Sequence, residues 1–286
     1  MHSLRTLVLI LVTAGIAAAQ TSWTGTASDA FADPANWSAG VPTATVDATI
    51  PSGTPNAPRV ANAGQAVRTL VVDGNATLEI AAGVDLAVFG SLTVTGAITG
   101  GGRVSMEGAD GTVLAGSGPL PGLRIAKTVN TRNVTVQDAP TVTGSLELTG
   151  GTLFTATPAI LTVQGDATFA GGQLSSNIDF SNNNDIGEIW VSGNVTFTGT
   201  TASGTQPDLF FAGDLTSDGT YDPTSSRFVA NGTAQQTIGG AAPRANGLFV
   251  ESGSSVRLTS TVVFRSTLSV LGTLTTDVAF DRPAVC

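Results

Sequence analysis

The sequence predicts an all-β protein: a single-stranded parallel β-helix, or β-solenoid, with an N-terminal capping segment. Three observations support this fold class. From residue 59 onward, apolar and polar residues alternate in short pieces of about three to five residues, as strands with one buried face require. Glycine-containing corners separate these pieces about every six to eight residues. After residue 20, no window combines the apolar face and the caps of a helix.

The spacing of the pieces distinguishes a solenoid from a sandwich. Antiparallel sandwiches have strands of about five or six residues, with turn signals every 8 to 12 residues. The shorter, denser pieces here indicate a chain that always turns the same way, with about three strands in a coil of roughly 20 residues. The residues expected to point inward from the first such pieces are Leu70, Val72, Leu78, Ile80, Leu86, Val88, Leu92 and Val94.

Residues 1–19 are predicted to be a secretory signal peptide. Arg5 supplies the positive start, Leu7 to Ile16 form the apolar stretch, and three alanines at 17–19 provide the cleavage site. The alternative is a buried N-terminal helix, but polar residues follow the alanines at once. Export from the cytoplasm is therefore the expected fate of this chain.

Residues 20–58 are expected to form a separate capping segment. They contain Trp23 and Trp37, two of the three tryptophans, and five of the 13 prolines. The solenoid is expected to span residues 59–276. Inside it, two blocks at 102–155 and 226–276 share a pattern of strands and corners offset by about 122 to 125 residues. The residues between these blocks keep the strand rhythm but have longer polar loops, which we expect to project sideways.

Residues 277–286 are expected to be a C-terminal tail that ends in Cys286. A truncated reading frame, a fragment and a freely secreted product are three interpretations of this ending, and truncation is favoured. The terminal cysteine could also form an intermolecular bond, which is the less favoured interpretation.

The composition excludes several classes of function. The only histidine is His2, inside the predicted signal peptide, so the mature chain would have no histidine for Ser-His-Asp catalysis or metal binding. A single cysteine allows no disulfide framework and no CxxC site. The net charge is −9 and the basic residues are scattered, which argues against nucleic acid as a partner. After the N-terminus no apolar run is long enough to span a membrane. We expect no cofactor.

Two stretches resemble known proteins. The opening motifs Trp23-Thr-Gly25, Asp33-Pro-Ala-Asn-Trp-Ser38 and Gly40-Val-Pro42, followed by Asp47, resemble the start of bacterial secreted β-helical surface proteins, including autotransporter-passenger-like chains. The run from Phe228 to Gly240, continuing to Leu274, is similar to repeats in surface proteins of type IX-secreting bacteria. The resemblance implies a parallel β-helix at the cell surface or outside the cell, and implies no catalytic residue.

The tryptophans of the capping segment have two interpretations. Trp23 and Trp37 could form an exposed platform on which sugar rings stack, because amphipathic aromatic rings suit recognition. Alternatively they close the end of the solenoid, where the first coil would otherwise expose its core. The second interpretation is favoured.

Two groups of acidic residues are candidate calcium sites, because calcium binds oxygen ligands. The first, in the stretch from Asn177 to Glu188, lacks the spacing of a calcium loop, and the second sits partly in a turn at Asp218-Gly219. Asn and Asp also hydrogen-bond the backbones of their own loops, so solvated loops are favoured for both. The residues are Asp179, Asn182, Asn183, Asn184, Asp185 and Glu188 in the first group, and Asp214, Asp218 and Asp222 in the second.

Threonine pairs and catalysis are the remaining considerations. Pairs at 93/95, 141/143 and 196/198 do not recur coil after coil, so strand propensity explains them better than a flat ice-binding ladder. Some parallel β-helices cleave acidic polysaccharides with clustered carboxylates and a basic residue. Here Lys127 is the only lysine, the arginines are dispersed, and no carboxylates repeat at coil spacing.

Together these observations predict an exported structural β-solenoid at the cell surface or outside the cell, possessing no assigned catalytic, binding or metal residue. An adhesin that binds surface glycans or matrix components is the more specific form of this hypothesis. A polysaccharide-cleaving lyase or hydrolase is the alternative.

Overall fold

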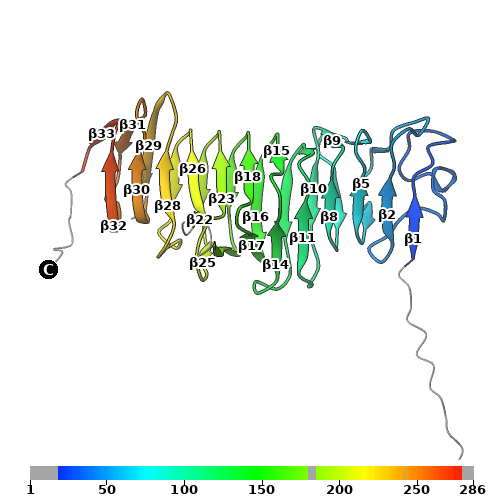
Figure 1. Ribbon diagram of the computed structural model, residues 1–286, viewed down its shortest axis with the longest axis horizontal. Helices are drawn as coiled ribbons and strands as arrows, with labels where there is room; N and C mark the ends of the chain where they lie inside the picture. Colours follow the sequence, from blue (N-terminus) through cyan, green and yellow to red (C-terminus); the bar gives the residue numbers. More distant parts are fainter. Residues whose placement is uncertain (1–18, 180–184, 242, 279–286) are drawn as a thin grey trace, which may run out of the picture.

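The computed structural model describes residues 19–179, 185–241 and 243–278. Within these ranges the chain is an elongated rod of short strands with a single 3-10 turn (Figure 1). The predicted signal peptide lies outside the described residues except for residue 19, and so does the predicted tail after residue 278. The strands of the main sheets all pair in parallel, so the expected parallel β-solenoid is confirmed.

Three long sheets form the faces of the rod. Sheet I contains β1 (Gln20–Ser22), β2 (Asp47–Ile50), β5 (Leu70–Val72), β8 (Leu92–Val94), β11 (Thr112–Ala115), β14 (Asn133–Val136), β17 (Thr152–Thr155), β20 (Gln173–Ser176) and β25 (Thr201–Ala202). Sheet II contains β4 (Ala66–Val67), β7 (Asp85–Val88), β10 (Arg103–Met106), β13 (Leu123–Ala126), β16 (Leu146–Gly150), β19 (Ala167–Phe169), β24 (Val195–Phe197), β27 (Leu215–Ser217), β29 (Gln235–Gly240), β31 (Ser255–Leu258) and β33 (Thr273–Thr276).

Sheet III completes the cross-section. It contains β12 (Pro119–Leu120), β15 (Thr141–Val142), β18 (Ile160–Val163), β23 (Glu188–Val191), β26 (Asp208–Phe211), β28 (Arg227–Ala230), β30 (Arg244–Val250) and β32 (Val263–Val270). A short sheet on the same side precedes it, and its last strand lies beside β12. Its strands are β3 (Arg59–Val60), β6 (Thr77–Ile80) and β9 (Ala97–Gly100).

Alternating side chains build the core, as the sequence predicts. Equivalent residues of successive coils are direct partners, for example Leu70 with Leu92 and Leu92 with Leu114. All eight residues that were expected to point inward are at most 1% exposed. Fully burying one such side chain is worth about 1.5–3 kcal/mol, so these ladders supply the main stabilisation of the rod.

The capping segment closes the N-terminal end. A 3-10 turn, η1 (Pro34–Asn36), begins at Asp33, whose carboxylate accepts the Ala35 backbone N–H at 2.9 Å. This turn brings Trp37 edge-on to Trp23 and Phe31, with ring centroids 5.1 and 5.0 Å apart. Residues 20–58 lie at the N-terminal end of the rod (Figure 1), and Trp23, Phe31 and Trp37 are buried there.

The coils change after β25. Sheet I ends there, and each later coil has only two named strands, one in sheet II and one in sheet III. This differs from the expected three strands per coil. Pro223 and Pro243 lie in the segments that pass the position of sheet I, where a residue without an N–H cannot complete a ladder. Three of the later strands are longer instead, at 6, 7 and 8 residues for β29, β30 and β32.

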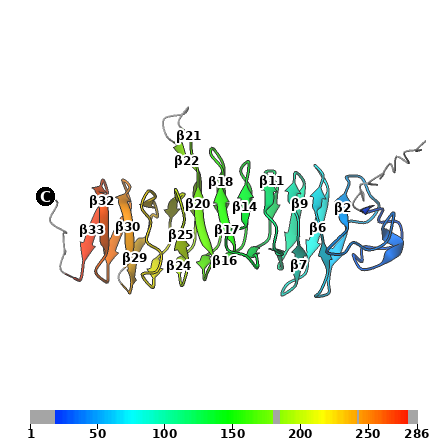
Figure 2. The same ribbon diagram turned by 90° about the horizontal axis from the view of Figure 1, so that it is seen from below.

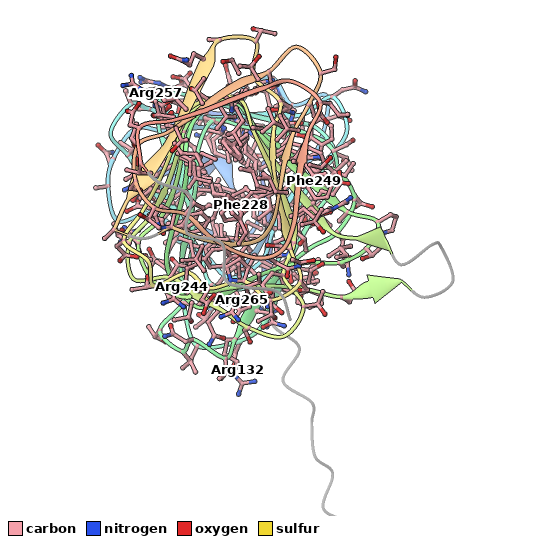
Figure 3. The ribbon with its side chains drawn as sticks, turned by 90° about the vertical axis from the view of Figure 1, so that its left-hand side faces the viewer. Arg132, Phe228, Arg244, Phe249, Arg257 and Arg265 are labelled. Carbon is pink, nitrogen blue, oxygen red and sulfur yellow. The ribbon has the colours of Figure 1, made fainter. Side chains whose placement is uncertain are left out.

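Aromatic side chains fill the core on both sides of β25. Phe169, Phe197 and Tyr221 stack through the interior, with centroids 4.9 and 4.4 Å apart, and Phe228 follows 6.0 Å from Phe197. Figure 3 looks along the rod and places Phe228 near the middle of the cross-section. Burial raises the pKa of the Tyr221 hydroxyl far above its ordinary value. Phe169 and Phe197 belong to coils that retain a strand of sheet I, whereas Tyr221 lies in the first segment that passes the position of sheet I without a strand.

One hairpin leaves the body of the rod. Strands β21 (Ile178–Asp179) and β22 (Asp185–Ile186) pair antiparallel and project sideways (Figure 2). The prediction of a lateral excursion between residues 156 and 225 is confirmed by this hairpin. It joins the end of β20 in sheet I to the start of β23 in sheet III.

The two related sequence blocks occupy different faces. Strand β10 of the first block lies in sheet II, whereas its counterpart β28 lies in sheet III. Likewise β11 lies in sheet I and its counterpart β29 in sheet II. The shared pattern therefore specifies strands and corners rather than a particular face, and the duplication itself stays a prediction.

Candidate functional site

Trp23 and Trp37 are not available as a sugar platform. Their side chains are only 1% and 5% exposed. Each indole Nε1–H donates to a backbone carbonyl at 2.7 Å, that of Asn56 for Trp23 and that of Phe31 for Trp37. Both polar groups are satisfied inside the cap, so these two rings stabilise the end of the rod.

The stretch from Asn177 to Glu188 includes the hairpin tip, and Asn182, Asn183 and Asn184 lie outside the described residues. Of the remaining candidates, the Asn177 side chain accepts the Thr157 backbone N–H at 2.8 Å. Glu188 accepts the indole N–H of Trp190 at 2.6 Å. Among the described residues, no group of three or more His, Cys, Asp or Glu side chains could hold a metal ion.

Asp214, Asp218 and Asp222 each have different hydrogen-bond or ion-pair partners. Asp214 accepts the Thr237 backbone N–H at 2.7 Å. Asp218 accepts from Gly199 and Thr220, and although burial opposes the effect, these hydrogen bonds hold its pKa below the ordinary value. Asp222 forms ion pairs with Arg265 and Arg244, and the Arg265 guanidinium lowers the pKa of this carboxyl.

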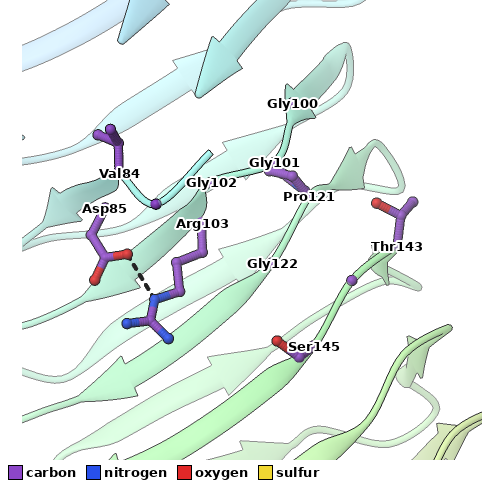
Figure 4. A pocket seen from close by; sticks show the side chains of 12 residues that line it. Val84, Asp85, Gly100, Gly101, Gly102, Arg103, Pro121, Gly122, Thr143 and Ser145 are labelled. Atoms are coloured by element: carbon purple, nitrogen blue, oxygen red, sulfur yellow. Dashed lines mark hydrogen bonds and ion pairs between the residues drawn. The ribbon is translucent and has the colours of Figure 1, made fainter. Parts of the chain in front are cut away.

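A polar groove of about 520 Å³ runs along the corner beside sheet II (Figure 4). Glycines at 83, 100–102, 122 and 144 line it, together with Asp85 and Arg103. Arg103 donates to Asp85 at 2.7 Å and to Glu147 at 2.8 Å, and Arg124 lies 3.7 and 3.9 Å from the same two carboxylates. Both carboxylates of this cluster therefore face guanidinium groups, a poor arrangement for a general base.

The threonine pairs form no common surface. Thr93 lies in sheet I, Thr141 in sheet III and Thr196 in sheet II. Pairs on three different faces cannot form one flat ladder, in agreement with the expectation from their spacing.

An outward column of aromatic residues distinguishes sheet III. Register pairs Trp190 with Phe210, Phe210 with Val229, and Val229 with Phe249 on four consecutive strands. We call these four residues the aromatic column. The residues on either side of each ring in its strand point inward, such as Ile189 and Val191 beside Trp190, and they are buried. The column therefore lies on the outer face of the rod.

The first two rings of the column stack on each other. The centroids of Trp190 and Phe210 are 4.4 Å apart, with an angle of 17° between the planes. Rings this close must lie face to face, because two rings side by side in one plane would need a larger separation. Trp190 remains 39% exposed, and Glu188 fixes its indole edge. The pair is held rigidly at the surface.

An ion pair between buried Asp208 and half-exposed Arg227 lies beside the column. Asp208 is 1% exposed and accepts the Arg227 backbone N–H at 2.8 Å and the Arg227 Nε–H at 2.7 Å. The guanidinium of Arg227 in turn lies over the ring of Phe249, 5.5 Å from its centroid. Gly247 leaves room for this ring, because a Cβ there would lie 3.2 Å from the Phe249 Cε2 atom. The last ring of the column is thereby fixed in place.

A small cavity lies beside the aromatic column. Its volume is about 180 Å³. Val229 lies between the two phenylalanines in the column, Arg227 lines the cavity near the strand starts, and Glu251 lines it near the strand ends. Ser269 and Leu271 of the last coil also line it. This cavity joins apolar walls to polar edges, as small-molecule sites do.

Comparisons with known proteins add no assignment: no protein-family model, no curated protein and no solved structure matches this chain. The resemblance to secreted β-helical surface proteins thus stays an expectation. In the described part of the chain, no helix is long and apolar enough to cross a membrane.

The aromatic column was missed by sequence reasoning, although a signal for it exists. Trp190, Phe210 and Phe249 each stand at the outward position of an alternating strand, between two apolar residues. They recur 20 and 39 residues apart, which is one and two coils. A search for aromatic residues at outward positions with coil spacing would have found them.

Proposed function

We propose that this protein is an exported β-solenoid that acts outside the cell as a rigid rod and binds glycans through the aromatic column. The single observation that carries the binding proposal is the outward stack of Trp190 on Phe210. An exposed aromatic surface favours carbohydrate because the C–H faces of sugar rings pack on aromatic rings while their hydroxyls reach polar neighbours. Glu188, Arg227 and Glu251 supply such neighbours.

Rigidity supports the role as a rod. Parallel ladders continue from coil to coil, and a chain of coils that contact only their neighbours can be long without losing its shape. The predicted signal peptide at residues 1–19 supports export. Cell-surface or matrix glycans are the proposed partners.

Binding without cleavage is the proposed activity, against the alternative of a polysaccharide-cleaving enzyme. The carboxylates of the groove cluster are held by Arg103 and Arg124. Those at 214, 218 and 222 accept backbone hydrogen bonds or form ion pairs. The carboxylates beside the aromatic column include Glu188, Asp208 and Glu251; Glu188 is engaged by the Trp190 indole and Asp208 by Arg227.

A glycan-array screen of purified residues 20–286 tests the proposal, run with and without calcium and followed by measurement of reducing-sugar release. We expect binding to one or more glycans, with no calcium dependence and no sugar release. A blank array would contradict glycan binding, and sugar release would favour the enzyme. In a bacterial host, N-terminal sequencing of the exported product should begin at Gln20.

The matched variants are Trp190→Ala and Phe154→Ala. Phe154 also points outward, but from sheet I, so its removal controls for the general loss of a surface ring. We expect Trp190→Ala to weaken binding at least tenfold and Phe154→Ala to leave it unchanged. Equal binding by both variants would place the glycan elsewhere on the rod.

A further inference from the structure

We propose that the glycan is recognised through a single neutral sugar ring, which stacks on the free face of Trp190 and stands over a pair of outward threonines. This inference rests on the proposed carbohydrate binding and adds to it the place, the number and the charge of the rings that are bound. The two threonines, Thr162 and Thr141, are the next outward residues of sheet III on the N-terminal side of Trp190. We call them the threonine shelf.

One face of the Trp190 ring is covered, and the other points toward the shelf. Phe210 stacks on the face that points toward the C-terminal end of the rod, because β26 follows β23 in sheet III. The opposite face therefore points toward β18, where the register partner of Trp190 is Thr162. A threonine side chain is much shorter than an indole, so it covers only the part of the ring near the backbone. The 39% exposure that Trp190 keeps in spite of the stack agrees with this arrangement.

The hydroxyls of the shelf are available to a ligand. Thr162 and Thr141 are both half-buried, and in the part of the chain that the structure describes their hydroxyls have no hydrogen-bond partner. Thr143, two residues further along the chain, differs because its hydroxyl donates to the Leu120 carbonyl at 3.0 Å. A free hydroxyl both donates and accepts, as the hydroxyls of a sugar require.

The spacing of the coils fits one sugar ring in front of Trp190. Neighbouring strands are about 4.8 Å apart, so Thr162 lies one spacing and Thr141 two spacings, or about 9.5 Å, from the Trp190 strand. Carbon atoms in contact are about 3.5–4.0 Å apart. A pyranose packed on the indole would therefore stand above the Thr162 strand. The hydroxyls on its rim would meet the shelf, and its C–H face would meet the indole.

The orientation of the indole limits how many sugars are bound. Trp190 and Phe210 stack from one coil to the next with 17° between their planes, so both planes lie across the rod axis. A sugar stacked on Trp190 takes the same orientation, and its equatorial glycosidic bonds lie close to its own plane. The glycan chain would therefore cross the rod or lead away from it, instead of following the aromatic column.

The other rings of the column are less available for stacking. Phe210 lies between Trp190 and Val229 in the register of the strands. The Arg227 guanidinium lies over the ring of Phe249. Trp190 is the terminal member of the stack, so its free face is where the column can accept a sugar ring.

The charge beside Trp190 disfavours acidic sugars. Glu188 accepts the indole N–H at 2.6 Å, which places a carboxylate at the edge of the ring. Its register partner in β18 is Ile160, and neither β18 nor β15 contains a lysine or arginine. A sugar carboxylate would approach Glu188 without a compensating cation. We therefore expect a neutral hexose or N-acetylhexosamine rather than a uronic acid.

Titration of residues 20–286 with oligosaccharides of increasing length tests this inference. The probes are the mono-, di- and hexasaccharides of the β-1,4-linked glucose, N-acetylglucosamine, mannose and galactose series, with oligogalacturonates as the acidic comparators. We expect at least one neutral series to bind, and its hexasaccharide to bind at most about tenfold more tightly than its monosaccharide. Simultaneous binding of further rings would raise the affinity by about 10²–10⁴-fold. A gain above tenfold, tighter binding of the acidic series or no binding by any neutral series would overturn the inference.

Two matched variants locate the ring. Thr162→Phe places a new ring against the free face of Trp190 and should weaken binding at least tenfold. Thr135→Phe is the control, because it places the same ring beside Phe154, its register partner on sheet I. We expect the control to bind as the wild type does, and melting temperatures show whether both variants fold. Full binding by the folded Thr162→Phe would overturn the inference.

A second, smaller change keeps the test valid if Thr162→Phe does not fold. Thr162→Val removes the shelf hydroxyl and keeps the shape of the side chain, so it should weaken binding about fivefold through the loss of one hydrogen bond. Unchanged binding by this variant would then overturn the inference.

Trp190→Ala and the glycan array separate this inference from the broader proposal. If Trp190→Ala loses binding while the folded Thr162→Phe keeps it, the sugar does not use the free face, yet glycan binding by the aromatic column stands. If the wild-type protein binds nothing on the array, the proposed function itself fails.

Discussion

The coils before and after residue 169, in β19, use aromatic residues differently. Between residues 59 and 168 the core consists of aliphatic ladders, and Phe89 and Phe154 are the only aromatic residues. In the later coils, rings stand both inside, as Phe197 and its neighbours, and outside, as the aromatic column. The earlier coils are built on three faces, whereas sheet I ends at β25 and the coils after it have two named strands each.

This difference indicates that the two regions of the rod have different roles. The earlier coils repeat the same pattern, in which aliphatic side chains point inward and are buried. Their outward positions are occupied by threonine and by paired charges. The later coils fill their interior with rings and present rings on sheet III, and after β25 they lack sheet I. The region that departs from the simple repeat is thus the region that carries the candidate site, where function is expected to override regularity.

The largest expected effect is on the interior rings. Phe197→Ala removes the central member of the stack and should lower the free energy of unfolding by about 3–5 kcal/mol. Phe154→Ala, which removes an outward ring of the earlier coils, should cost less than about 1 kcal/mol. Urea unfolding of both variants measures the difference. Equal losses would contradict the packing described for the later coils.

Two buried charges, one in each region, give the next test. Asp208, in the later coils, is paired with Arg227. Asp208→Asn should therefore cost about 1.5–3 kcal/mol of unfolding free energy, because the buried side chain loses its charge-assisted hydrogen bonds to Arg227. Glu79→Gln, which breaks an exposed pair with Arg59 in the earlier coils, is the control and should cost less than about 1 kcal/mol. A loss no larger than the control would mean that the Asp208 pair is not structural.

Lys127 is the buried charge of the earlier coils. In contrast to the loss of the Asp208 charge, the loss of the Lys127 charge should not lower the free energy of unfolding. The lysine is 3% exposed, and its ammonium donates to the Glu107 carbonyl, while the carboxylates of Asp110 and Glu107 act on it only through their charge. Burial lowers its pKa from 10.5 to about 8. Between these values the unfolded chain binds the proton and the folded chain does not, so stability should rise with pH.

From pH 8 to 9.5 this rise should amount to about 2 kcal/mol in the wild type. Lys127→Met should lack the rise and should be at least as stable as the wild type at pH 7. Urea unfolding across this pH range is the measurement. A wild-type stability that is flat or falls from pH 8 to 9.5 would show that Lys127 is not buried as described.

The smallest effect on stability, and a clear optical one, concerns the tryptophans. Trp23 and Trp37 are enclosed in the cap, whereas Trp190 is 39% exposed in the aromatic column. Acrylamide should therefore quench mainly Trp190, and Trp190→Phe should remove most of the quenchable emission while changing stability by about 0.5 kcal/mol or less. Persistent quenching in this variant would mean that the cap is open.

Much of the fold was predictable because burial alone dictates it. The alternation at Leu70, Val72 and Leu78 indicates which face of each strand points inward, and the glycine corners indicate where the chain turns. The change from three strands per coil to two could not be predicted from the alternation of apolar and polar residues. It depends on Pro223 and Pro243 and on how the rings of the later coils fill the interior, which is a property of packing between distant residues.

The candidate site was harder to predict, because it depends on the register between strands of successive coils. In the sequence, Trp190, Phe210 and Phe249 are isolated aromatic residues. Only the alignment of successive coils places them in one column. Trp23 and Trp37 attracted attention because they stand in a conspicuous motif, yet the structure buries both. The ion pair of Asp208 with Arg227 likewise joins residues 19 apart that only the coil repeat brings together.

The most direct test of the central claim compares outward rings of the two regions on a glycan that binds the wild type. Binding is measured for the double variant Trp190→Ala/Phe249→Ala and for Phe89→Ala/Phe154→Ala, with melting temperatures to confirm folding. The account predicts at least a hundredfold loss for the first variant and unchanged affinity for the second. Full binding by the folded first variant, or an equal loss in both, would contradict it.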